Sequence, residues 1–593
     1  MSARRNMTLR RIVVLIRVIT LGLALSAFLR PIETAAQQTF GDAIRIGDSA
    51  WVARRYVPAK SAYLRAVSLD SAGSTQAIFR LGILRSWDGE LQEAIALFGR
   101  YVRLEPRDEE GRIALARTYA WAGETNNSVA VYDSILSRDA TYRDAALGAA
   151  QALAWGGKLR EALVRYDRWT EFHPRDTEAS LARARALAWA GRLGDAGRAY
   201  AQIAADGDSL EGRKGSALIA AWKGDLFSSE DQWSRLAHDY PNDGRVWLGL
   251  AQVLRWSGRA QEAHDALAHS LVVAPDDADV RVEARWIRGA LAPAVMPSVT
   301  MSWDSDGNRV TRSDIRAVIR PIRLVTASLG ASQHQAELGA LSARSLSTRL
   351  GVRWLADRHL TLNGDVGVVQ TVGRGGALPV DRSRMIGSAQ ATVTLSPRIS
   401  IGGNIGRDLF DETAVGLLSS IDVTSENLET AVDLGGRASL GIAADRARFT
   451  GGSTPNQREG LSGALRWRAK RSLMLALNGR AMRYSTNTHD GYFSPEQYRL
   501  GEVTGRYEPP RDLGWSGFLE GGAGLQSVLN NGAEARQGTR RVGVGVVHRW
   551  SPGNELAVEY GESNVAGTAA TAGLRGVVYS YQAVTLRGRV KLR

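Results

Sequence analysis

The chain carries two different patterns of apolar and polar positions, one in each half. Up to about residue 290 the pattern is alanine-rich and helical. After Pro293 and Pro297 glycine becomes more frequent and apolar residues alternate with polar ones, as in residues 473–477 and 584–592. A period of two residues is typical of strands with one apolar and one polar face. The pattern therefore predicts an all-α N-terminal region followed by an antiparallel C-terminal region of strands.

Within the helical half a tryptophan returns at steps of 34, 34, 34, 33 and 34 residues. Each tryptophan is followed two positions later by a glycine. Small residues stand seven positions before and five positions after each glycine, and a bulky residue stands nine positions after it. The six tryptophans are Trp87, Trp121, Trp155, Trp189, Trp222 and Trp256, and the bulky residues are Phe98, Tyr132, Tyr166, Tyr200, Trp233 and Leu267. This period predicts stacked helix pairs, because no single pair buries its apolar face alone.

The glycines suit the turn inside each pair, and four prolines fall where the second helix of a pair should end. These prolines are Pro106, Pro174, Pro241 and Pro275. The pattern closely resembles the tetratricopeptide repeat (TPR) over residues 74–280. A weaker copy is expected at 40–73, with Ala53 in the tryptophan position and Leu64 in the bulky position. The resemblance implies a solenoid that binds other molecules.

In the second half, tight turns and longer polar stretches alternate. The tight turns are expected at 320–321, 356–358, 396–398, 435–436, 469–471, 509–510 and 551–553, and the longer stretches at 373–383, 408–427 and 485–497. Seven short turns with a strand at each end give about 16 strands, with both ends on one side. Such alternation is the layout of a transmembrane β-barrel. A soluble β-sandwich is the alternative, although about 300 residues is large for one.

Residues 1–36 have the layout of a signal peptide. A basic start precedes an apolar segment, Ile12–Phe28, and small residues stand at 34–36. A retained membrane anchor is the alternative. The predicted organisation is a signal peptide at 1–36, a TPR solenoid at 37–290, a linker at 291–297 and a barrel at 298–593. The solenoid is expected in the periplasm and the barrel in the bacterial outer membrane.

The chain has no cysteine and a formal net charge of +14. Disulfides and thiolate metal sites are therefore excluded. Residues 296–593 hold 36 Lys and Arg against 26 Asp and Glu. Arg587, Arg589 and Lys591 fall on the polar face of the last strand and are candidate lumen residues. A basic lumen suits a polar or anionic polymer, but a general preference for arginine explains the same residues equally well.

Catalytic and cofactor motifs are lacking, and the protein is expected not to be an enzyme. Gly157-Lys158 is without the glycines and hydroxyl residue of a phosphate-binding loop, and no serine stands in a glycine elbow. The eight histidines are scattered without metal-ligand spacing. Residues 304–308 resemble a calcium loop but have Arg309 where an EF-hand needs glycine, so a polar loop is expected there. No cofactor, metal or nucleic acid is expected.

The six tryptophans are the best candidate binding residues. TPR proteins often turn this position towards the concave surface, and indole faces suit stacking on sugar rings. The alternative is that the six indoles pack between repeats as core.

A signal peptide, TPR array and barrel in this order resemble bacterial exopolysaccharide exporters. The repeat at 188–192 and the barrel start at 304–307 are also similar to TPR proteins with a YaiO-type barrel. The resemblance implies export or assembly of an exopolysaccharide through the barrel, with synthase proteins of the periplasm or inner membrane as partners of the TPR array and outer-membrane lipid around the barrel. The alternative is a non-transporting, membrane-anchored scaffold or receptor.

Overall fold

The computed structural model describes residues 40–69, 74–207, 209–374, 380–435, 437–488, 490–566 and 579–592. The expected signal peptide lies outside them. The chain forms two compact units that divide after Gly212. The described residues of the first unit form helices and their connections, and the second unit joins the last helices to a barrel of strands.

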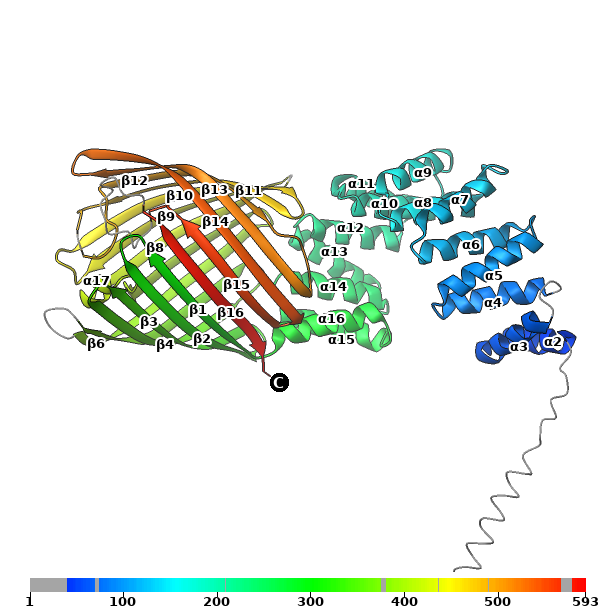
Figure 1. Ribbon diagram of the computed structural model, residues 1–593, viewed down its shortest axis with the longest axis horizontal. Coiled ribbons are helices and arrows are strands. Elements are labelled where there is room, and N and C mark those ends of the chain that lie inside the picture. The colour runs from blue at the N-terminus through cyan, green and yellow to red at the C-terminus, as the bar shows by residue number, and fades with distance from the viewer. Residues whose placement is uncertain are drawn as a thin grey trace, which may run out of the picture. The chain divides into compact units, whose positions relative to one another are not determined.

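The described helical half is a series of short antiparallel helices of 12 to 14 residues (Figure 1). They are α2 (Phe40–Val52), α3 (Tyr56–Leu69), α4 (Thr75–Trp87), α5 (Leu91–Leu104), α6 (Glu109–Trp121), α7 (Thr125–Leu136), α8 (Arg143–Trp155), α9 (Leu159–Phe172), α10 (Thr177–Trp189), α11 (Leu193–Ala205), α12 (Leu210–Trp222), α13 (Leu226–Asp239), α14 (Gly244–Trp256), α15 (Ala260–Val273) and α16 (Ala278–Leu291). All six repeat glycines have φ between 74° and 90°. Side chains with a Cβ rarely adopt this conformation, which is why glycine closes each helix pair.

The small and bulky positions of the repeat form the core of the array, as predicted. Ala150 and Ala162 are fully buried, and so are the equivalent residues of the other repeats. The bulky residues, from Phe98 to Leu267, are also buried. A Cβ at Gly82 would lie 2.8 Å from the Phe98 ring, so a small residue is needed there.

The first repeat differs from its predicted register. Tyr63, not Leu64, is the buried bulky residue, and it packs against Gly47 as Phe98 packs against Gly82. Val52 therefore takes the tryptophan position in place of Ala53. Arg54, with φ of 54°, takes the position of the glycine. The first two repeats are 35 residues apart, so a fixed period of 34 misplaced these residues by one.

The second half is a closed antiparallel barrel of 16 strands, as predicted. The strands are β1 (Ala294–Asp304), β2 (Asn308–Ile322), β3 (Val325–Leu338), β4 (Leu341–Leu355), β5 (Leu360–Arg374), β6 (Val380–Ser396), β7 (Ile399–Leu409), β8 (Asp422–Gly435), β9 (Ala438–Thr450), β10 (Asn456–Lys470), β11 (Leu473–Tyr484), β12 (Gln497–Tyr507), β13 (Gly514–Asn530), β14 (Ala533–Ser551), β15 (Asn554–Ser563) and β16 (Tyr581–Lys591). Each strand pairs with its neighbour in sequence, and β1 closes the barrel on β16 through pairs such as Val299–Leu586 (Figure 1). Closure leaves no unpaired edge.

Six of the seven predicted short turns join strands where expected. The turn placed at 320–321 lies three residues later, between Ile322 and Val325, because Pro321 is accommodated at an irregularity in the β2–β3 pairing. The predicted linker is also shorter, since α16 ends at Leu291 and β1 begins at Ala294. Pro297 belongs to β1 and pairs in register with Ile315. We call the end of the barrel with these seven turns the short-turn end, and the opposite end the loop end.

The barrel exposes an apolar band on its outer face. Leu461, Leu477, Val503 and Leu519 are each more than half exposed, and such side chains alternate with polar or buried ones along every strand. Exposed aromatics on the same face lie close to the short turns: Trp354, Trp467, Tyr507, Trp515 and Trp550. An apolar band bordered by aromatics is typical of outer-membrane barrels. Of the described helices, none is long and apolar enough to cross a membrane.

Within the second unit, helices α13, α15 and α16 contact the short-turn end of the barrel. The Arg358 guanidinium between β4 and β5 lies 2.6 Å from Asp231 and 5.2 Å from the centre of the Phe227 ring. A Cβ at Gly289 would lie 2.6 Å from the carbonyl oxygen of Pro552, so α16 and the β14–β15 turn meet backbone to backbone. The last helices and the barrel are therefore packed together as one unit.

Candidate functional site

Each tryptophan of the repeat is the last residue of the first helix in its pair, as in α4, α6 and α8. Their exposed fractions lie between 40% (Trp256) and 57% (Trp87). The alternative prediction that they are core is therefore wrong, because the buried bulky residues fill that place. We call the six residues the tryptophan row. Binding by this row stays a prediction.

An additional aromatic pair extends the first part of the row. Trp51 stacks on Trp87 with ring centres 6.0 Å apart and planes 14° apart, and Tyr56 meets Trp87 edge to face at 5.2 Å. Both residues were missed because they stand outside the 34-residue period. They precede Trp87 by 36 and 31 residues, which is close to one repeat length, and this spacing was the available signal.

Ion pairs between neighbouring repeats hold their spacing. The Arg143 guanidinium at the start of α8 lies 2.9 Å from Asp176, the N-cap of α10. The pKa of Asp176 is lowered to about 2, mainly by this guanidinium. The Trp169 indole N–H and the Ala179 amide also donate to the carboxylate and contribute less. Arg259 pairs in the same way with Glu230 of the preceding repeat, at 2.7 Å. Within each of the two units, neighbouring repeats that carry these tryptophans are thus held together by charge as well as by packing.

The barrel contains a cavity of about 670 Å³ whose lining includes charged side chains. Residues from strands that are not neighbours, including Thr392 of β6, Arg466 of β10 and Arg541 of β14, line it together, so it lies in the lumen. Acidic and basic side chains pair across its wall. Arg541 lies 3.3 Å from Glu502, and other lumen pairs are Arg506–Glu520, Arg458–Asp445 and Arg549–Glu555.

The three candidate residues of the last strand lie on the face of β16 opposite the exposed Leu586 and Val590. Arg587 pairs with Glu559 at 2.8 Å and Glu555 at 3.6 Å. Arg589 is opposite Glu555 in the β15–β16 register, and Lys591 is opposite Ala294. The structure therefore places this arginine-rich stretch beside carboxylates, which balance part of its positive charge. Their role in the lumen stays a prediction.

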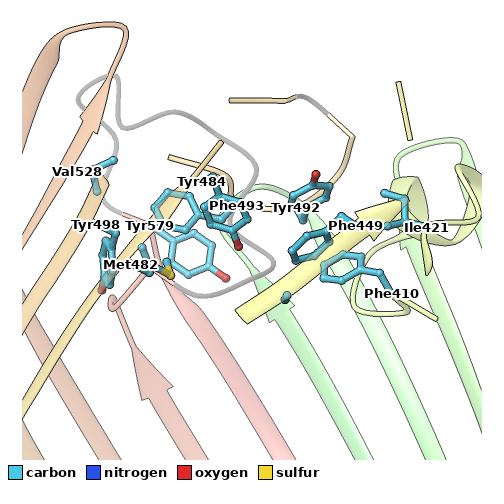
Figure 2. Packing of buried hydrophobic residues seen from close by; sticks show 12 residues of the cluster. Phe410, Ile421, Phe449, Met482, Tyr484, Tyr492, Phe493, Tyr498, Val528 and Tyr579 are labelled. Atoms are coloured by element: carbon cyan, nitrogen blue, oxygen red, sulfur yellow. The ribbon is translucent and has the colours of Figure 1, made fainter. Parts of the chain in front are cut away.

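At the loop end, aromatic side chains gather inside the barrel, as Figure 2 shows. We call the buried cluster the loop-end cluster; its members are Phe410, Ile421, Ala447, Phe449, Met482, Tyr484, Tyr492, Phe493, Tyr498, Val528, Ala566 and Tyr579. Some come from strands and others from the loops after β7, β11 and β15. The Phe449 and Tyr492 rings stack with centres 4.5 Å apart and planes 8° apart, which fixes a loop against the wall.

The same loops are fastened by hydrogen bonds and by a short helix. Helix α17 (Ala414–Leu418) packs on β3, β4 and β5, with Leu417 fully buried. The Thr413 hydroxyl donates to the carbonyl of Gly491 at 2.7 Å and so joins two loops. Gln526 of β13 donates to the carbonyl of Asn564 at 2.9 Å and accepts from the Ala566 amide at 2.9 Å. The described part of the loop end is therefore filled by packed side chains.

The three long connections were predicted, but only as polar loops. Aromatic residues in two of them, Phe410, Tyr492 and Phe493, were the overlooked signal, and Tyr579 lies in a further connection, between β15 and β16. The acidic stretch after β1 is an ordinary turn in which Asp304 accepts from the amides of Asp306 and Asn308. No cluster of three or more His, Cys, Asp or Glu that could hold a metal ion occurs in the part of the chain that the structure describes.

No family model and no curated protein matches this chain. Solved structures match at low identity. A "Bacterial polysaccharide outer membrane secretin" is 12% identical over 51% of this chain and 99% of its own, with a TM-score of 0.40. A tetratricopeptide repeat protein from Parabacteroides merdae is 13% identical over 41% of this chain and 96% of its own (TM-score 0.36). PilW, a type IV pilus biogenesis factor, is 19% identical over 37% of this chain and 99% of its own (TM-score 0.31).

With TM-scores below 0.5, these likenesses carry no argument, and the assignment rests on the chain itself. A TPR-like array of helices precedes a closed barrel whose outer face is apolar and bordered by aromatics. These features indicate an outer-membrane protein that combines a TPR-like array with a barrel.

Proposed function

We propose that this protein assists the assembly or export of an exopolysaccharide across the outer membrane. In this proposal the TPR-like array lies in the periplasm, where it binds the polymer and docks proteins of the synthase complex. The carrying observation is the tryptophan row, in which six indoles at equivalent places stay half exposed. Solvent-exposed indoles in a regular series suit a ligand that is itself a repeating chain, since each sugar ring has an apolar face for stacking.

The lumen supports the same proposal. Its wall carries charged and amide groups, among them Arg466, Asn478 and Glu502, which can exchange hydrogen bonds with hydroxyl groups of a passing sugar chain. Because both acidic and basic groups line it, the lumen suits neutral or mixed-charge polymers as well as anionic ones. The protein holds no nucleotide site by sequence, so movement of the polymer would come from its synthesis.

The test is binding of soluble polysaccharides to the full-length protein in detergent, measured by isothermal titration calorimetry. The double substitution Trp155→Ala/Trp189→Ala removes two neighbouring indoles of the row. We expect affinity to fall about tenfold, since 1.4 kcal/mol corresponds to one factor of ten. The matched control is Phe172→Ala, which removes an aromatic that is 71% exposed in the same array but ends a second helix of its pair. Equal affinity of the two variants, or no binding by the wild type, would contradict the proposal.

A second function is favoured by the loop-end cluster. A barrel whose loop end is filled by packed aromatics would serve as an anchor for the array or as a receptor that displays its loops. The two functions differ in whether the cluster opens. In an exporter the loops after β7, β11 and β15 must separate from the wall, whereas in an anchor they stay packed at all times.

A further inference from the structure

On the outer face of strands β9–β14, the exposed side chains near the short turns are mostly apolar. Towards the loop end, the exposed side chains on the same face include several arginines. We call these residues the arginine belt; they are Arg446 and Arg448 of β9, Arg483 of β11, Arg499 of β12, and Arg536 and Arg540 of β14.

The belt borders the apolar band directly. Arg446 follows the half-exposed Ile442 by four residues, Arg499 precedes Val503 by four, and Arg540 precedes Val542 by two. At about 3.3 Å per residue, the arginines lie within about 13 Å of side chains that face lipid tails. Their stems can lie along the band while the guanidinium reaches the level of the lipid headgroups.

The strand register makes the belt continuous across several strands. Arg446 is opposite Glu459, and Glu459 is opposite Arg483. Further along, Arg499 is opposite Ser527, and Ser527 is opposite Arg536. Neighbouring strands are about 4.8 Å apart. Arg483 of β11 is opposite Gln497 of β12, two residues from Arg499, so the guanidinium groups of Arg483 and Arg499 are close enough to share one anion or one multiply phosphorylated headgroup.

The partners inside the protein leave the belt positive. Arg483 pairs with Glu459 at 2.6 Å, Arg536 with Glu534 at 3.0 Å and Arg540 with Glu562 at 3.2 Å. Exposed pairs of this kind are weak and compete poorly with other anions. A guanidinium has five N–H donors, and these pairs use one or two of them.

We propose that the arginine belt binds the phosphate groups of an anionic lipid in the membrane leaflet at the loop end. The position decides the source of the phosphate. A free anion has no reason to gather beside an apolar band, whereas a lipid phosphate is held there by its own acyl chains. Arginine is suited to this ligand because its planar fork forms paired, charge-assisted hydrogen bonds with phosphate oxygens.

Two arginines on another part of the barrel wall can be compared with the arginine belt. Arg309 of β2 and Arg344 of β4 also face outward near the loop end. Arg309 is opposite Glu337 in the β2–β3 register, and Arg344 donates to Gln333. These two arginines are on strands separated by β3, whereas Arg483 and Arg499 of the belt are on the adjacent strands β11 and β12. They are therefore matched controls for position and residue type.

The test is lipid retention by the full-length protein, measured by native mass spectrometry after release from detergent. The probes are lipid A, which carries phosphates, its dephosphorylated form with the same acyl chains, and excess inorganic phosphate as a competitor. The wild type should retain lipid A but not the dephosphorylated form, and inorganic phosphate should not displace it. Arg483→Ser/Arg499→Ser should lower retention of lipid A about tenfold or more, since each arginine near an anionic surface contributes about 1 kcal/mol.

The control Arg309→Ser/Arg344→Ser should retain lipid A as the wild type does. Heat-modifiable migration in gels establishes that both variants form the barrel. Equal losses in both double variants, or equal retention of the dephosphorylated lipid, would overturn the proposal. Displacement by inorganic phosphate would assign the belt to free anions instead. None of these readouts depends on polysaccharide binding, so the proposed function can fail while the belt stands, and the reverse.

Discussion

The helical array and the barrel both expose aromatic residues, but for different physical reasons. In the barrel, Trp515 and Trp550 lie at the border of an apolar band, where a membrane covers them. In the array, Trp155 and Trp189 are exposed with no such band beside them, while the bulky residues Tyr166 and Tyr200 fill the core. The same residue type is thus an anchor in one region and a candidate ligand surface in the other. Exposure alone does not separate the two roles; the surroundings of the side chain do.

The largest effect should come from breaking the core of the array. Phe98→Ala removes a ring that is 1% exposed beside Gly82 and Phe79, so we expect a loss of about 3–5 kcal/mol. Trp121→Ala, at an exposed position, should cost much less. Urea unfolding of the full-length protein in detergent, followed by the helical circular dichroism signal, measures both. Equal shifts of the unfolding midpoint would mean that the tryptophan row is structural.

The substitution Leu519→Arg tests whether the outer face of the barrel contacts lipid. Leu519 is 61% exposed in the apolar band, and an arginine there should destabilise the membrane-inserted barrel by up to about 2–4 kcal/mol. Folding into phospholipid vesicles, titrated with denaturant, gives this value. Leu519→Ala, which keeps the site apolar, is the control. A cost below that of the alanine control would place this face in water.

Acid should loosen the array before the barrel, because the array depends on charge between repeats. The pKa of Asp176 is lowered to about 2 in the folded state, from an ordinary value near 3.9. Its contribution is therefore complete above about pH 4 and is lost as the pH falls towards 2, a difference of about 1–2 kcal/mol.

Helical stability measured from pH 5 to 2 tests this expectation. Asp176→Asn should lower stability at pH 5 and flatten its dependence on acid, because the amide still caps α10 but lacks the charge for Arg143. An unchanged pH profile in this variant would contradict the role given to the Arg143–Asp176 pair.

The smallest effect should come from the aromatic border of the barrel. Trp515→Ala should weaken insertion into vesicles by about 1 kcal/mol, since an exposed indole at this level contributes packing with headgroups and little else. It should leave polysaccharide affinity unchanged. A loss of polysaccharide binding in Trp515→Ala would remove the distinction between the two groups of tryptophans.

Local period and turn chemistry made most of the fold predictable. A 34-residue register places each glycine at a positive φ and each bulky residue in the core, because each repeat depends only on its neighbours. The seven short turns predicted the number of strands, because in a barrel of sequentially paired antiparallel strands the short turns at one end alternate with loops at the other. The register of the first repeat was missed because one extra residue separates Tyr63 from its equivalent, Phe98.

The candidate site was less predictable because its parts are brought together by closure of the barrel. Phe449 and Tyr492 are 43 residues apart and belong to a strand and a loop, so no spacing rule connects them. The pairing of Arg587 with Glu559 likewise follows from the strand register and not from the pattern of the last strand alone. Sequence pattern gave the polar face of β16 but not the carboxylates that balance it.

The most direct test of the central claim is single-channel conductance of the full-length protein in a planar bilayer, compared with Phe449→Ala/Tyr492→Ala. This substitution removes the stacked pair that fixes a loop against the wall. The account predicts a wild type that is closed or opens briefly, and a variant with stable openings that a bound polysaccharide blocks. A variant that inserts as a folded barrel and never conducts would contradict export and leave the barrel as an anchor.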